Sequence, residues 1–537
     1  MMSAPRTEVR DLVVIGAGFA GMYAIHRAAA AGIDVQGIEA GSGVGGTWYW
    51  NKYPGARCDV ESVDYSYSYD DALQREWVWT EKYATQPEIL RYAGHVAARF
   101  GLNDRIRFNE RVQSAIFDEE SSLWIISTDV GDPIRARFVI FASGSLSIPI
   151  RPEFPGVDSF AGDVYFTAQW PDDDVSFEGK RVGVVGTGSS GIQVIPMIAQ
   201  VAEAVTVFQR TANYSIPAVN RPLGDVEQRE IRADYAGRRA RTRVGLAGSG
   251  IPTYEGDPLR LGENEQREVL EEHWTQGGVY FARTFAGQMT DLDVNRVVSE
   301  FVHSKIREIV KDPQTAEDLI PTDHPIGSKR ICSDSGYYET YNRGNVHLVN
   351  LRREPIEEVT PTGVRTPAAF YDIDVMVYAT GFDAMTGALT RIDIEGRDGL
   401  RFADAWGDGP VTYLGMSVPG FPNLFVVNGP GSPSVLSNMI LGAEQQVEWI
   451  VDLVATCLAG ATAQVEPRED SALKWTDHVD EVAHTTLYPM ANSWYMGANV
   501  TGKKQVFMPY VGGLGEFTRI CEEVVSDHYE GFVFTSL

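Results

Sequence analysis

The sequence predicts an α/β fold that contains two Rossmann-like dinucleotide-binding domains. A G-x-G-x-x-G turn follows an apolar run near the N-terminus, and the same turn returns 170 residues later. Each turn stands between a strand-like and a helix-like segment, which is the context that gives this motif its meaning. The 537 residues also leave room for three to four domains of roughly 150 residues each.

The first turn contains Gly16, Gly18 and Gly21 and follows the apolar run from Leu12 to Ile15. In this motif the glycines allow the tight turn, close approach of the backbone to a pyrophosphate, and packing of the helix on the strand. The helix N-terminus then presents unpaired N–H groups to the phosphates. Glu39 stands 23 residues after Gly16, where an acid can accept hydrogen bonds from both ribose hydroxyls. We therefore expect this site to bind FAD.

The second turn has the same form, with Gly186, Gly188 and Gly191 as its glycines and Thr187 and Ser189 between them. It follows the apolar run "RVGVVG" and precedes the helix-like "IQVIPMIA". The spacing therefore predicts a second phosphate-binding turn in front of a second helix.

The strand after the second turn ends differently from that of the first site. Gln209 stands 23 residues after Gly186, where the first site has its acid, and Arg210 and Thr211 follow it. A carboxylate would repel a 2′-phosphate, whereas a guanidinium binds one in a fork. This site therefore favours NADPH over NADH. Two such sites imply hydride transfer from NADPH to flavin, and leave open whether the reduced flavin then serves a protein, a disulfide or oxygen.

Charge and cysteine usage narrow the class of protein. The net charge of −27 argues against nucleic-acid and anionic-membrane partners, because both need clustered cations. The N-terminus lacks the layout of a signal peptide. None of the nine histidines has metal-ligand spacing, so no metal site is expected. The four cysteines, Cys58, Cys332, Cys457 and Cys521, form no C-x-x-C pair, which argues against a dithiol redox site or a zinc ribbon. We expect a cytoplasmic protein, because four scattered thiols in a chain of this length fit a reducing compartment.

The stretch "GGTWYWNKYPGARCD", residues 45–59, resembles the first signature of the type I Baeyer–Villiger monooxygenases. That signature is a small residue, Gly, any residue and Trp, followed by an aromatic-Pro-Gly group and an Asp. The matching residues are Gly45, Gly46, Trp48, Tyr53, Pro54, Gly55 and Asp59. Other segments are most similar to the phenylacetone and steroid monooxygenase branch, and the resemblance runs from about residue 10 to the C-terminus.

The second signature of that family, F-x-G-x-x-x-H-x-x-x-W-P, corresponds to residues 160–171. Phe160, Gly162, Trp170 and Pro171 match it, and Phe166 stands where the family has histidine. Proline disfavours helix in the residue before it, so we expect an extended junction with Phe160 packed under it. We expect Phe166 to leave the chemistry intact and to loosen the coupling of NADPH use to product.

The resemblance implies an FAD domain made from both chain ends, an NADPH domain inserted in it, and a helical insertion inside that. The charge-rich, helix-patterned stretch from about Arg221 to Asp323 fits the helical part. The expected segments are 1–145 and 381–537 for FAD, 146–220 and 326–380 for NADPH, and 221–325 for the helical insertion.

The resemblance also implies the reaction. Reduced FAD and oxygen form a C4a-peroxyflavin, which attacks a ketone and leads to an ester or lactone, and no obligatory protein partner is needed. The protein must supply a permanent cation near the flavin. Arg330, in "GSKRICSDSGYYE", matches the catalytic arginine of the family, and Asp59 matches the aspartate that pairs with it. Lys329 matches a residue that contacts the 2′-phosphate of NADPH, alongside Arg210 and Thr211.

The remaining expected site residues surround the two cofactors. Gly46, Thr47 and Trp48 belong to the FAD segment together with Asp59, and Trp494 matches a tryptophan on a mobile lid loop over NADP⁺ and substrate. A core position is the alternative for Trp494. We expect the apolar wall of the ketone pocket to contain Pro430, Val435, Leu436 and Met439.

Three rival functions remain open at this stage. A flavin monooxygenase that oxidises sulfur or nitrogen would share both glycine turns, although such enzymes usually lack the Trp-Pro signature. An NADPH–FAD reductase that performs no oxygenation, or a nucleotide sensor without activity, would also need both turns.

Overall fold

The computed structural model describes residues 9–248, 254 and 256–536. Its first sheet has eight strands, β1 (Val9–Ile15), β2 (Val35–Ile38), β3 (Ile106–Arg107), β4 (Val112–Asp118), β5 (Leu123–Thr128), β6 (Ile134–Phe141), β17 (Asp393–Glu395) and β18 (Leu424–Val426). Their order is β17-β4-β5-β6-β1-β2-β3, with β18 beside β6, and the neighbours of β1 run parallel to it. Strands from distant parts of the chain thus share one sheet.

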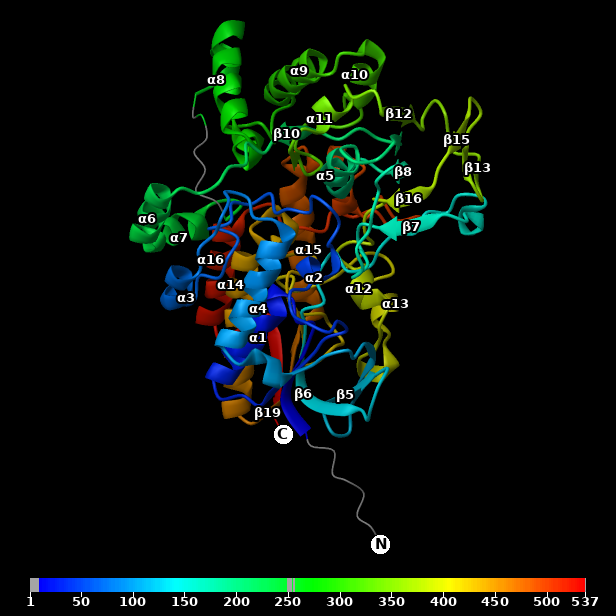
Figure 1. The fold of residues 1–537 in the computed structure, drawn as a ribbon. Coiled ribbons are helices and arrows are strands. Elements are labelled where there is room, and N and C mark those ends of the chain that lie inside the picture. Colours follow the sequence, from blue (N-terminus) through cyan, green and yellow to red (C-terminus); the bar gives the residue numbers. More distant parts are fainter. Residues whose placement is uncertain (1–8, 249–253, 255, 537) are drawn as a thin grey trace.

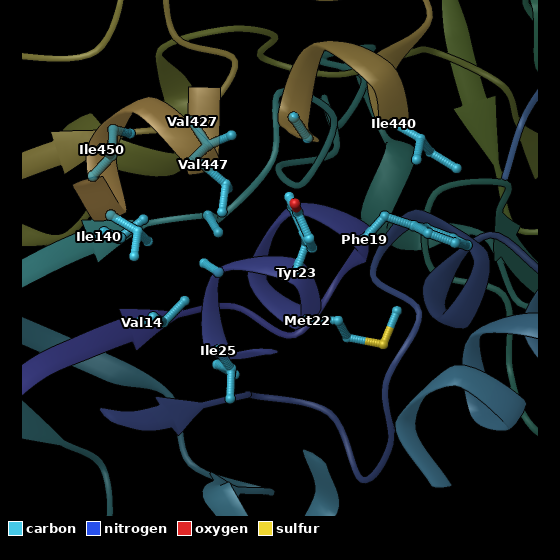
Figure 2. Close-up of a cluster of buried hydrophobic side chains, with 14 of the residues drawn as sticks. Val14, Phe19, Met22, Tyr23, Ile25, Ile140, Val427, Ile440, Val447 and Ile450 are labelled. Atoms are coloured by element: carbon cyan, nitrogen blue, oxygen red, sulfur yellow. The ribbon is translucent and has the colours of Figure 1, made fainter. Parts of the chain in front are cut away.

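Helix α1 (Phe19–Ala30) follows β1 and is buried on most of its surface, because it is apolar nearly all round. It packs against α14 (Met439–Ala459), which comes from the other end of the chain. Figure 2 shows Val14, Ile140, Val447 and Ile450 gathered beside α1, where the sheet, α1 and α14 meet in one core cluster.

Further helices complete this part of the molecule (Figure 1). They are α2 (Thr47–Trp50), α3 (Asp71–Glu76), α4 (Gln86–Arg99), α12 (Gly387–Thr390), α13 (Phe402–Ala405), α15 (Glu469–His484) and α16 (Leu514–Ser526). Two strands that are distant in the chain, β19 (Thr462–Pro467) and β20 (Phe532–Ser536), pair antiparallel, and β19 contacts α14.

The second sheet has five parallel strands, β7 (Asp163–Phe166), β8 (Arg181–Val185), β9 (Ala204–Gln209), β12 (Val346–Asn350) and β16 (Val375–Tyr378). Their order is β12-β9-β8-β16-β7, and α5 (Ser189–Ile198) follows β8. A small antiparallel sheet, β13 (Glu358–Thr360), β14 (Gly363–Arg365) and β15 (Phe370–Asp372), projects at its side (Figure 1). The first sheet is mixed and the second is parallel, and each carries a strand–turn–helix unit, which confirms the predicted α/β class.

A group of helices lies between the paired short strands β10 (Ser215–Pro217) and β11 (Cys332–Asp334) along the chain. These helices are α6 (Asp225–Ala233), α7 (Tyr235–Val244), α8 (Glu263–Gln276), α9 (Leu292–Ile309) and α10 (Pro313–Leu319), and α11 (Tyr337–Thr340) follows β11. Figure 1 shows α8, α9 and α10 at the end of the molecule farthest from β19. Over the part of the chain with described coordinates, no helix is both long and apolar enough to span a membrane.

Residues 163–166 form the edge strand β7 rather than a plain junction. Successive side chains of a strand point to opposite faces. Phe166 therefore packs in one cluster with Phe160 and Tyr378, while its neighbour Tyr165 packs in another. Trp170 packs in a different cluster, with Tyr53. The expectation that Phe160 packs under the Trp170 junction is therefore wrong, because the sheet separates the two clusters.

Candidate functional site

The first glycine turn is shaped so that only glycine fits its ends. Gly16 has φ +102°, and a Cβ there would lie 2.6 Å from the carbonyl oxygen of Ala142. A Cβ on Gly21 would lie 1.9 Å from the carbonyl oxygen of Gly16. The turn therefore brings the start of α1 tightly against β1 and β6, and leaves the helix N-terminus open toward a phosphate.

Glu39 lies at the end of β2 and is only 6% exposed. Its Oε2 accepts the N–H of Ala17 and its Oε1 accepts the N–H of Gly41, both at 2.7 Å. Each carboxylate oxygen has a second lone pair left for a hydrogen bond. The residues present therefore fit a ribose diol beside the first turn, as an FAD site requires.

Glu39→Gln should weaken FAD binding. The amide nitrogen would face a backbone N–H donor, and it could not accept a hydrogen bond from a ribose hydroxyl. A hydrogen bond to a charged group contributes about 1.5–3 kcal/mol, so we expect the affinity for FAD to fall roughly 10- to 100-fold. The flavin-to-protein absorbance ratio after dialysis measures this. Circular dichroism and NADP⁺ binding should stay unchanged, and full retention of flavin would contradict the assignment.

The Gly46 loop packs directly on the first turn. A Cβ on Gly46 would lie 2.8 Å from the Cα of Gly18, and the N–H of Gly45 donates to the carbonyl of Ala17 at 3.0 Å. Thr47 is exposed at the start of α2. Trp48 is buried in the core, where its indole N–H donates to Tyr65 Oη at 3.0 Å. The Trp48 indole therefore belongs to the core on which this loop packs.

The second turn repeats the geometry of the first. Gly186 has φ +106°, and its Cβ would lie 2.5 Å from the carbonyl oxygen of Ala379, just as Gly16 meets Ala142. A Cβ on Gly191 would lie 2.2 Å from the carbonyl oxygen of Gly186. In contrast, a Cβ on Gly188 would have no described atom within 4 Å. The space above Gly188 is therefore open to a pyrophosphate.

Side chains of the second turn connect it to the next strand. Thr187 Oγ1 donates to the carbonyl of Thr211 at 3.0 Å. Ser189 begins α5, and its Oγ lies 3.3 Å from the Sγ of the buried Cys332. A hydrogen bond therefore connects the phosphate-binding turn to the segment that follows β9.

Arg210 and Lys329 are the two cations of the predicted 2′-phosphate subsite. Arg210 is exposed and Lys329 is half-buried, and neither has an ion-pair partner among the residues that the structure describes. Burial lowers the pKa of Lys329, and the nearby Arg352 and Arg210 lower it further, against the effect of Asp323. One exposed and one half-buried cation, neither with an ion-pair partner among the described residues, fit an anionic ligand such as the 2′-phosphate of NADPH.

Arg330 forms a bidentate ion pair with Asp59, with Nε to Oδ2 at 2.7 Å and Nη2 to Oδ1 at 2.6 Å. Its Nη1 donates to the carbonyl of Val435 at 3.1 Å. Burial would raise the pKa of Asp59, but the charge of Arg330 and the hydrogen bonds to the carboxylate together outweigh burial and hold that pKa below its usual value. The carboxylate of Asp59 raises the pKa of Arg330 in turn, so both groups stay charged at neutral pH.

The predicted pocket residues gather beside this pair. Val435, Leu436, Met439 and Trp494 belong to one apolar cluster. Pro430 is buried on the loop that leads to them, and its carbonyl accepts a hydrogen bond from Thr412 at 2.8 Å. Sequence reasoning missed Tyr495, which is buried in the same cluster with its ring 4.4 Å from that of Trp494. No pattern in the sequence distinguishes Tyr495 from any other core aromatic.

The loop that carries Trp494 is tied to the chain segment after β16. Lys503 Nζ donates to Asp383 Oδ1 at 2.8 Å and to the carbonyl of Ala384 at 3.1 Å. Asn499 Nδ2 donates to the carbonyl of Phe382 at 2.7 Å. These contacts were not expected from the sequence, because Lys503 and Asp383 carry no motif.

The two signature segments meet in space. The N–H of Trp170 donates to the carbonyl of Trp50 at 3.3 Å, and Lys52 forms an ion pair with Asp172. Tyr53 packs in the same cluster as Trp170. The signatures therefore mark the two sides of one contact, between the loop after the first turn and the edge of the second sheet.

A phosphate-binding turn at each of the two sheets, with an arginine ion pair beside an apolar cluster, defines a flavoprotein oxidoreductase that uses two dinucleotides. Residues 13–229 match the family model "Pyridine nucleotide-disulphide oxidoreductase".

Relatives of full length define the family more narrowly. The chain is 40% identical to a 2-oxo-Δ³-4,5,5-trimethylcyclopentenylacetyl-CoA monooxygenase of Pseudomonas putida, over 99% of each protein. It is 38% identical to a Baeyer–Villiger monooxygenase of Pseudooceanicola batsensis, over 97% of this chain and 96% of that protein. A solved structure of oxidised steroid monooxygenase bound to NADP matches with TM-score 0.94 and 51% identity, over 99% of this chain and 100% of the other.

The chain belongs to the type I Baeyer–Villiger monooxygenases. It is an FAD- and NADPH-dependent enzyme that converts ketones to esters or lactones.

Proposed function

We propose that this enzyme oxygenates predominantly apolar ketones in the pocket beside Arg330. The observation that carries the proposal is the contact of Arg330 with both Asp59 and the carbonyl of Val435, at the edge of the apolar cluster that contains Trp494. A cation next to an apolar wall suits a substrate whose one polar point is its carbonyl.

When bound, FAD supplies the oxygen-activating chemistry and accepts the hydride of NADPH. The guanidinium of Arg330 has five N–H donors, and Asp59 and Val435 use three of them. The two that remain can stabilise negative charge as it develops on the ketone oxygen. Asp59 fixes the orientation of the guanidinium, and the apolar cluster that contains Val435 lies beside it.

We also propose roles for the two ends of the second dinucleotide site. Gly186, Thr187, Gly188, Ser189 and Gly191 would hold the pyrophosphate of NADPH. Arg210, Thr211 and Lys329 would hold its 2′-phosphate. Two observations support these roles. The space above Gly188 is open, and Arg210 and Lys329 have no ion-pair partner within the described part of the chain.

We propose that both chain ends form the FAD domain, with the NADPH domain and the helical insertion between them. The pairing of β18 with β6, and of β12 with β9, supports this division. We assign the protein to the cytoplasm, because its four cysteines are buried free thiols.

A substrate panel tests the function. The purified holoenzyme is given NADPH, oxygen and aromatic, cyclic or steroidal ketones, with a thioether as competitor for the sulfur-oxidising alternative. We expect esters or lactones by mass spectrometry, with bulky apolar ketones preferred over small polar ones. Hydrogen peroxide without oxygenated product across the whole panel would contradict the proposal.

Phe166→His should alter coupling rather than product identity. The Phe166 ring lies 5.2 Å from the ring of Tyr378 and 5.3 Å from the Arg151 guanidinium, so its contacts belong to the edge of the second sheet. Histidine there can form hydrogen bonds that phenylalanine cannot. We expect the ratio of ester to hydrogen peroxide per NADPH to change, with the same ester formed. A changed ester, or oxygenation only in the variant, would contradict this view.

A further inference from the structure

We propose that Arg352 is a third cation of the 2′-phosphate subsite and a determinant of the preference for NADPH over NADH. The proposal rests on the assignment of the second dinucleotide site to NADPH. Arg352 belongs to none of the sequence motifs described above, and only the pairing of strands brings it to this site.

The fold brings Arg352 to the right edge of the sheet. Strands β9 and β12 are parallel neighbours, and the N–H of Leu351 donates to the carbonyl of Gln209 at 2.8 Å. Arg210 follows the last residue of β9, and Arg352 stands two residues after the last residue of β12. Because carboxyl ends of parallel strands meet at one edge, both side chains leave the sheet where dinucleotides bind.

A direct contact places the Arg352 guanidinium at the subsite. Its Nη2 lies 3.5 Å from Oγ1 of Thr211. The Arg352 charge is also among the causes that lower the pKa of Lys329, after burial. Arg352 therefore stands within electrostatic reach of Lys329 and directly beside Thr211.

Asp323 holds Arg352 in this place. One carboxylate oxygen of Asp323 forms an ion pair with Arg352, and the other lies 2.6 Å from Nδ1 of His324. The His324 side chain is fully buried, with its ring 5.4 Å from that of Tyr214. The carboxylate that orients Arg352 is thus itself anchored on a rigid, buried ring.

The charges of the cluster match the ligand. Arg210, Lys329 and Arg352 supply three positive charges, Asp323 supplies one negative charge, and burial lowers the pKa of His324 so that its ring stays neutral at neutral pH. The net charge of about +2 complements a phosphate monoester, which carries about −1.5 to −2 near pH 7. Without Arg352, Asp323 would cancel one of the two remaining cations.

The neighbouring Arg353 provides a matched control. Both arginines are exposed, at 57% and 51% of the side chain, and each is paired with a carboxylate, Arg353 with Asp318 and Arg352 with Asp323. Among the described residues, Arg352 also contacts Thr211, and Arg353 has no such contact.

Calorimetry on the FAD-loaded enzyme, without ketone, tests the proposal. The probes are NADP⁺, 2′,5′-ADP and NAD⁺, and the variants are Arg352→Gln, Arg352→Lys and Arg353→Gln. We expect Arg352→Gln to weaken NADP⁺ and 2′,5′-ADP roughly tenfold or more, since a charge-assisted hydrogen bond is about twice as strong as a neutral one. NAD⁺ affinity should not change, Arg352→Lys should restore part of the loss, and Arg353→Gln should match the wild type.

Two outcomes separate failures of the two proposals. If the wild type bound NADP⁺ no more tightly than NAD⁺, the assignment of the second site to NADPH would itself be wrong. If the wild type discriminated and Arg352→Gln discriminated equally well, or lost NAD⁺ to the same extent as NADP⁺, the role of Arg352 would be overturned.

Discussion

Arg330→Ala should abolish ester formation while leaving the reduction of FAD by NADPH in place. In this variant the developing charge on the ketone oxygen loses the two N–H donors that Asp59 and Val435 leave free. Loss of one preorganised donor to such a charge typically costs about 10²–10³ in kcat. We therefore expect ester formation to fall at least about 100-fold, measured by mass spectrometry against NADPH consumption. Bleaching of the flavin by NADPH without oxygen should persist.

Arg330→Lys separates charge from geometry. Lysine keeps the positive charge but cannot reproduce the fork that binds both oxygens of Asp59, so we expect most of the loss to remain. Arg397→Ala is the matched control, because Arg397 and Glu466 form an ion pair with exposures of 31% and 22%, against 34% and 21% for Arg330 and Asp59. Equal loss in both variants would mean that a broken ion pair, rather than the role of Arg330, causes the defect.

Gly188→Ala should sharply weaken NADPH binding without weakening the fold. Gly188 precedes α5 with φ −81° and ψ −171°, a conformation open to any residue, and no described atom lies within 4 Å of its Cβ position. The added methyl group would therefore crowd only a bound pyrophosphate. Overpacking costs about 1–3 kcal/mol, so we expect the Kd for NADP⁺ to rise by about tenfold or more. Calorimetry and thermal unfolding measure the two effects.

A second glycine provides the comparison for Gly188. Gly224 also precedes a helix, α6, with φ −74° and ψ 159°, and its Cβ position is equally open. Gly224→Ala should leave both NADP⁺ affinity and thermal stability as in the wild type. Gly186→Ala should differ from both, because φ +106° and a 2.5 Å contact with Ala379 would strain the protein itself. Unchanged NADP⁺ binding in Gly188→Ala would contradict the proposed position of the pyrophosphate.

Local sequence patterns predicted the two turns well, because the strand, the turn and the helix of each unit are consecutive in the chain. Gly21 and Gly191 meet the first glycine of their own turn, whereas Gly16 and Gly186 meet the distant Ala142 and Ala379. The acid at Glu39 also follows from spacing alone, since β2 is the next strand after α1. The fold class was therefore predictable from the glycine turns, from the apolar runs before them and from the residue that follows the next strand.

The site between these units was predictable only in part. The resemblance named Arg330 and Asp59 together, and the structure does pair them. Sequence reasoning did not find the third contact of Arg330, to the carbonyl of Val435, because a backbone oxygen carries no residue signature. Sequence reasoning also placed Phe160 wrongly. Phe160 and Trp170 lie on either side of β7 along the chain, and they pack in different clusters on opposite faces of the second sheet.

The sequence by itself determined the α/β class, the two glycine turns and the residues Glu39 and Arg210 that follow the next strand, because each belongs to one strand–turn–helix–strand unit. Only the tertiary structure decided which distant residues meet. Asp59 and Arg330 lie 271 residues apart, and Thr211 and Arg352 lie 141 apart. Such contacts depend on which strands pair and which sheet edges coincide. No local pattern encodes that pairing, because it is set by burial of the whole sheet and its covering helices.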